Sequence, residues 1–202
     1  MTTTRTQPPP DLSREEQSIY AKAIERTWGL LEGLPTYHER DGADLGFFGQ
    51  RRLRKARAAL EPCDGLGVNA PGLSWIRGRL SHVAGTLAEA KADLEVAARG
   101  FPSEVGLLTD LTLINLSLGD GVAASTYGRA AVDLVPDDDD LKVAYAYAVV
   151  LEGHPKRALG ILANVCKRDP DHSGARVALD VVRKIIDGKM DPPGTIGPTP
   201  VS

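Results

Sequence analysis

Apolar residues in this 202-residue chain recur at intervals of three and four positions over most of its length. This is the spacing of one helix face, and it predicts an all-α fold. Ser13 and Glu16 form a capping-box pattern, so we expect a first helix to begin at Ser13 and to end near Gly33. Its apolar stripe consists of Ile19, Ala23, Ile24, Trp28 and Leu31.

A second helix is predicted from about Asp44 to Glu61, with Pro62 ending it. Its expected buried side consists of Leu45, Phe48, Leu53, Ala56 and Leu60. The segment 34–43 is expected to be a loop, and the Gly- and Pro-rich segment 63–72 a link.

Three residue types then recur with a spacing of 34. They are Gly85, Gly119 and Gly153; Ala90, Ala124 and Ala158; and Pro102, Pro136 and Pro170. Gly favours the left-handed backbone that ends a helix, Ala permits two helices to cross closely, and Pro stops the second helix. The period therefore predicts three helix pairs over residues 73–168.

The second helices of these pairs continue one apolar face, and a last helix is expected at about His172–Asp187. The second-helix positions are Leu94, Ala97, Ala131, Leu162 and Val165. The last helix has the apolar side Ala175, Ala178, Leu179, Val182 and Ile186 and the polar side Arg176, Asp180, Arg183, Lys184 and Asp187. Such a polar side suits the end of a repeat array.

These segments resemble the tetratricopeptide repeat family, which implies a right-handed superhelix of antiparallel helix pairs. The chain departs from the family at two places. Gly78 has Thr112 and Ala146 as its counterparts, and Gly128 replaces a bulky residue. The expected organisation is a disordered tail at 1–10, a helical hairpin at 11–62 that can be interpreted as a degenerate repeat, three repeats with a capping helix at 71–188, and a disordered tail at 189–202.

Composition narrows the function classes. The net charge is −3 and the pI is near 5.8, so nothing in this balance demands a nucleic-acid backbone or an anionic membrane as a partner. No signal peptide and no membrane-inserting segment is expected, and Cys63 and Cys166 are expected to be free thiols. These features predict a cytoplasmic protein.

Candidates for chemistry each have a simpler structural interpretation that we favour. They are the link glycines Gly65, Gly67 and Gly72 for phosphate; His38, Glu39, Asp41 and Asp44, or Asp137–Asp140, for a metal; and the basic cluster Arg51, Arg52, Arg54, Lys55 and Arg57 for a partner. None has the spacing of an established motif, and the basic residues spread around much of a helix. Cys63 and Ser74 lack the context of a nucleophile. We therefore expect no enzyme activity, no cofactor and no metal.

The resemblance instead implies a partner-binding groove lined by the first helix of each pair. Its positions are Trp75, Arg79, His82, Thr109, Leu113, Leu116, Val143, Tyr147, Val150, Val177 and Val181. An apolar groove of this kind suits a protein or peptide partner. The alternative is that the N-terminal helix, with Ile19, Ile24 and Trp28, or a second copy of the chain fills it.

The leading hypothesis is a non-catalytic adaptor or chaperone in a bacterial-type cytosol, with a small secretion chaperone as its narrower form. The alternatives are an assembly subunit of a complex or homo-oligomer, and a regulatory accessory of an enzyme in trans.

Overall fold

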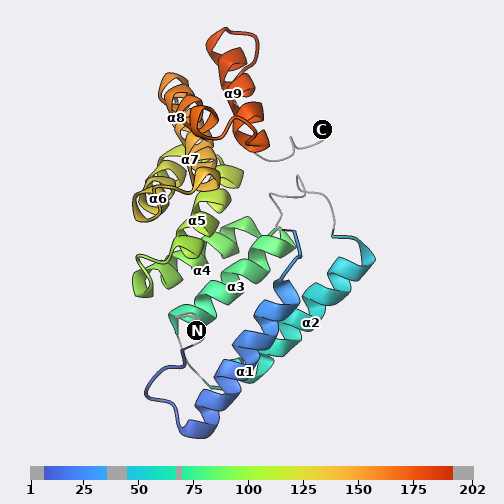
Figure 1. Cartoon of the computed structure of the whole chain (residues 1–202). Helices are drawn as coiled ribbons and strands as arrows, with labels where there is room; N and C mark the ends of the chain where they lie inside the picture. Colours follow the sequence, from blue (N-terminus) through green and yellow to red (C-terminus); the bar gives the residue numbers. More distant parts are fainter. Residues whose placement is uncertain (1–6, 36–44, 67–69, 193–202) are drawn as a thin grey trace. The chain divides into compact units, whose positions relative to one another are not determined.

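A computed structural model describes residues 7–35, 45–66 and 70–192, and within them it contains nine helices and no strand (Figure 1). The helices are α1 (Arg14–Leu31), α2 (Gly46–Asp64), α3 (Pro71–Ala84), α4 (Leu87–Gly100), α5 (Val105–Leu118), α6 (Gly121–Leu134), α7 (Asp139–Leu151), α8 (Pro155–Arg168) and α9 (Ser173–Ile186). The prediction of an all-helical chain is confirmed.

Helix boundaries repeat with the spacing of the marked residues. α3, α5, α7 and α9 each begin 34 residues after the one before, and so do α4, α6 and α8. Gly85, Gly119 and Gly153 follow the first helices with φ of 88°, 76° and 95°, a left-handed conformation that residues with a Cβ rarely adopt. Pro102, Pro136 and Pro170 each lie one residue beyond the C-cap of a second helix, as predicted.

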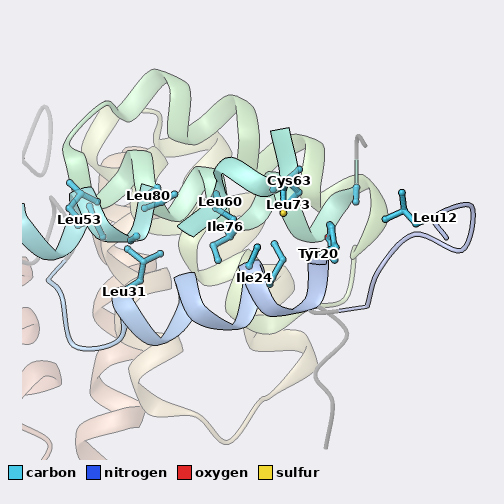
Figure 2. Packing of buried hydrophobic residues seen from close by; sticks show 14 residues of the cluster. Leu12, Tyr20, Ile24, Leu31, Leu53, Leu60, Cys63, Leu73, Ile76 and Leu80 are labelled. Atoms are coloured by element: carbon cyan, nitrogen blue, oxygen red, sulfur yellow. The ribbon is translucent and has the colours of Figure 1, made fainter. Parts of the chain in front are cut away.

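The chain divides into two compact units, 1–102 and 103–202. In the N-terminal unit, α3 packs against α1, α2 and α4. Figure 2 shows apolar side chains of α1, α2 and α3 pointing toward one another, including Tyr20, Ile24, Leu60 and Ile76. Both hydrogen bonds of the Ser13–Glu16 capping box are present, so the predicted start of α1 is confirmed.

In the C-terminal unit, each helix from α5 to α9 packs against the next, and α7 also contacts α5 and α9. Ala158, Leu162 and Val165 of α8 are buried between these helices, as are Ala175, Ala178 and Val182 of α9. The five predicted polar positions of α9 are all exposed. Ile185 rather than Ile186 completes its buried side.

The two departures from the repeat pattern compensate for each other. A Cβ on Gly78 would lie 2.7 Å from Cγ of Leu94, whereas one on Gly128 would lie 3.3 Å from Cγ2 of Thr112. The small residue therefore belongs to the first helix in one pair and to the second helix in the next. A close helix crossing needs one small side chain, and either helix can supply it.

Two predictions about α2 are wrong. Pro62 does not end the helix, which continues to Asp64, and Phe48 is 80% exposed instead of buried. Cys63 is buried in this last turn, so the link is shorter than expected. Most of the predicted loop, part of the link and most of the two predicted tails lie at 36–44, 67–69, 1–6 and 193–202, outside the described residues.

Candidate partner-binding face

The first helices of the C-terminal unit place equivalent residues on neighbouring helices. Thr109, Val143 and Val177 hold the same position of α5, α7 and α9, and Leu113, Tyr147 and Val181 hold another. Val177 is 62% exposed and the other five are half-buried. We call these six residues the first-helix face.

Tyr147 lies at the centre of this face. It packs against the cluster of Leu116, Ala124 and Ala148, which Leu113 also contacts. It packs as well against the cluster that Val143 and Val181 contact. The half-buried ring thus joins the two ends of the face. Burial raises the pKa of the Tyr147 hydroxyl, which therefore remains a neutral hydrogen-bond donor and acceptor at physiological pH.

The third predicted position of each first helix is part of the core. His82 is fully buried, and Leu116 and Val150 are 1% and 2% exposed. These residues follow Arg79, Leu113 and Tyr147 by three positions, which turns the side chain toward the second helix of the pair. They are therefore inaccessible to a partner, and their inclusion in the groove was wrong.

The predicted groove residues of α3 are covered within the N-terminal unit. Trp75 is 3% exposed and meets Trp28 of α1 edge-to-face, with ring centroids 5.4 Å apart. The Arg79 guanidinium lies 5.7 Å from the centre of the same Trp28 ring, a cation–π contact. α1 therefore occupies this face of α3, as the self-filling alternative anticipated for the N-terminal helix.

Apart from the first-helix face, the C-terminal unit has a hollow of about 460 Å³ that is lined by residues of α6, α7 and α8. Its lining residues are Arg129, Val132, Asp133, Lys142, Tyr145, Ile161, Asn164 and Arg168. Its three cations are all in ion pairs with carboxylates of the chain, which offsets their charge. Sequence reasoning missed this hollow, although Gly128 marks the place where α6 approaches Tyr145.

The acidic run Asp137–Asp140 has structural partners. Asp137 and Asp139 bind Arg168 of α8, and Asp138 caps α7 by accepting a hydrogen bond from the Leu141 amide. The hydrogen bond from Arg168 lowers the pKa of Asp139. The acidic run thus has structural contacts, and its carboxylates lie at a helix N-terminus, where negative charge is favourable.

The remaining metal and thiol candidates from the sequence form no site among the described residues. His38, Glu39, Asp41 and Asp44 lie outside the described residues, and the described part of the chain holds no group of three or more metal-ligating side chains. Cys63 is buried, which raises the pKa of its thiol, and Cys166 is half-buried; both are free. Among the described helices, none is long and apolar enough to cross a membrane.

Comparison with known proteins adds no family assignment. Neither the known protein families nor the curated proteins contain a match to this chain.

Proposed function

We propose that this chain is a tetratricopeptide-type repeat protein, a right-handed superhelix of helix pairs, that binds a partner polypeptide on the first-helix face without catalysing a reaction. The observation that carries the proposal is the repetition of side chains. Two positions of the first helix, four residues apart and each repeated every 34 residues, supply four aliphatic side chains, one threonine and one tyrosine across three adjacent helices. Repeat proteins bind extended ligands on surfaces of this kind.

The composition of the face indicates the chemistry of the partner. Leu113, Val143, Val177 and Val181 offer apolar contact, whereas Tyr147 adds a ring with a hydroxyl. No Lys or Arg is among the six residues, so the face does not favour a free carboxylate. An amphipathic or extended segment with apolar anchors is the ligand that fits, with Tyr147 as the central contact.

Site-specific photo-crosslinking tests this proposal. A photoreactive phenylalanine analogue at position 147 should form a crosslink with a partner in its native extract, and mass spectrometry would identify it. The matched control places the analogue at Val122 of α6, which is 65% exposed but lies outside the face. Equal crosslinking of the same protein from both positions, or crosslinking from position 122 alone, would refute the proposed site.

An assembly subunit is the second candidate, and the exposure of Val177 favours it. This valine belongs to the last described helix, where a further helix or a second copy could cover it. Light scattering separates the two candidates. A monomer that still yields the crosslink from position 147 supports an adaptor, whereas a stable oligomer that dissociates on Val177→Asp supports assembly.

A further inference from the structure

α2 is longer than the repeat spacing requires. The residue 34 positions before the start of α4 at Leu87 is Leu53, yet α2 begins at Gly46. The added segment is about two helical turns. It carries Phe47 and Phe48, which are 71% and 80% exposed and stack edge-to-face with centroids 5.5 Å apart.

Three cations share the surface of α2 that these rings occupy. At about 100° per residue, Phe47, Phe48, Arg51, Arg54 and Lys55 span an arc of roughly 120°. All five are exposed, whereas Ala56 and Leu60, on the opposite side, are buried. We call these five residues the α2 outer face. Three members of the basic cluster therefore share one side of α2, whereas Arg52 and Arg57 lie outside this arc.

The cations of the α2 outer face are not used in contacts with other described residues. Arg51, Arg54 and Lys55 form no ion pair or hydrogen bond within the described part of the chain. Arg52 differs, because its guanidinium donates hydrogen bonds to the backbone carbonyls of Gly29 and Glu32 at the end of α1. Of the basic cluster, Arg52 therefore has a structural role.

We propose that the α2 outer face docks on an anionic lipid bilayer surface. Exposed rings dip into the boundary between headgroups and acyl chains, and adjacent Lys and Arg side chains attract anionic headgroups. The whole chain has a net charge of −3, so the attraction must be local and would orient the protein with α2 toward the membrane.

The shape of the face favours a bilayer over a polypeptide or a nucleic acid. Rings that are 71% and 80% exposed protrude, whereas Tyr147 of the first-helix face is half-buried by its neighbours. A peptide or a single strand is usually held in a groove that covers it from two sides. A fluid lipid interface needs no such groove and accepts protruding rings.

Vesicle co-sedimentation of the full chain tests the proposal. We expect binding to phosphatidylcholine vesicles that contain about one-third phosphatidylserine, and weak binding to pure phosphatidylcholine. Arg51→Gln/Arg54→Gln/Lys55→Gln and Phe47→Ser/Phe48→Ser should each reduce the binding at least about tenfold. Raising the salt concentration should weaken vesicle binding by the wild-type protein and should affect binding by the triple Gln variant much less.

A matched variant controls for net charge. Arg14→Gln/Lys22→Gln/Arg26→Gln removes three exposed cations from α1 of the same unit and should change binding by less than about twofold. Helical content and melting temperature would verify that each variant folds. Tyr147→Ala should bind vesicles normally, so failure of the lipid proposal and failure of the first-helix face are separate outcomes.

Three results would overturn the proposal. One is equal binding to neutral and anionic vesicles, and another is equal loss in the α1 and α2 triple variants. The third is binding of an acidic peptide or a single-stranded oligonucleotide, but not of vesicles, that the α2 triple variant abolishes. That third result would assign the face to the ligand that bound.

Discussion

In the N-terminal unit, α1 lays Trp28 over Trp75 and Arg79 of α3. In the C-terminal unit, the equivalent positions of α5, α7 and α9 hold side chains that are half-buried or exposed. The position of Trp75 is thus buried in one unit and accessible in the other, whereas Arg79 is half-buried like its counterparts. Sequence register sets the direction of a side chain, and the neighbouring element sets whether a partner can reach it.

The third position shows the opposite behaviour. His82, Leu116 and Val150 are buried in both units, although their side chains differ in chemistry. Their burial follows from the contact between the two helices of each pair, which every repeat contains. A repeated position with constant burial therefore belongs to the scaffold, whereas a position with variable burial is the better candidate for binding.

The largest expected effect concerns the packing of Trp28 of α1 against α3. Trp28→Ala should reduce the free energy of unfolding by about 2–4 kcal/mol, because it removes a large ring from a packed aromatic pair. Chemical denaturation of the full chain measures this loss, and Trp28→Phe should recover much of it. A loss below about 1 kcal/mol would mean that α1 does not stabilise α3 through this contact.

A smaller change in stability tests whether the two units share one type of helix crossing. Ala90 and Ala124 are both fully buried at equivalent positions. Ala90→Leu and Ala124→Leu should each destabilise by about 1–3 kcal/mol through overpacking. Ala163→Leu, on the exposed side of α8, is the control and should be nearly neutral. Tolerance of leucine at one site alone would show that the two crossings are not equivalent.

The accessible first-helix face of the C-terminal unit predicts an effect on binding. For a partner found by crosslinking, Tyr147→Ala should weaken affinity by about 1–2 kcal/mol, because a half-buried ring supplies the central contact. Isothermal titration would measure it, with Val122→Ala as the exposed control. Tyr147→Phe should retain most of the affinity if the ring rather than the hydroxyl makes the contact.

The smallest effect concerns pH and the core of the N-terminal unit. Burial, with a lesser contribution from Cys63, raises the pKa of Tyr20 from 10 to about 12. The unfolded chain then loses this proton at a lower pH than the native chain, so stability should fall as pH rises through this interval. The slope contributed should be less than about 1.4 kcal/mol per pH unit.

Denaturation at pH 9 and above would reveal this slope, and Tyr20→Phe should reduce it. Tyr147→Phe is the matched variant of the C-terminal unit, where burial also raises the pKa of the hydroxyl. An unchanged slope in Tyr20→Phe would mean that another group, such as the buried Cys63 thiol, controls the alkaline stability.

The sequence predicted those parts of the fold that depend on local chemistry. The capping box fixed the start of α1, and the three glycines with positive φ marked the ends of the first helices. The period of 34 predicted the three helix pairs between 71 and 170 because each pair repeats the same turn and the same close crossing. These features need only a few neighbouring residues.

Contacts between distant segments decided the rest. Leu45 and Phe48 continue the apolar stripe of α2, yet Phe48 is exposed because burial requires a facing element as well as a pattern. The candidate face was predicted in part. Its six members were in the sequence-based set, whereas the three at the third position were buried and Trp75 was covered by Trp28.

The sequence by itself determined helix type, the ends of the repeated helices and the repeat register, since these follow from backbone preferences and from spacing along one helix. Only the tertiary structure decided which faces remain accessible. An apolar stripe indicates that one face of a helix is buried. Which element covers that face depends on how the whole chain folds. Trp28 of α1 covers α3 in this way, and nothing in the sequence of α3 itself predicts this contact.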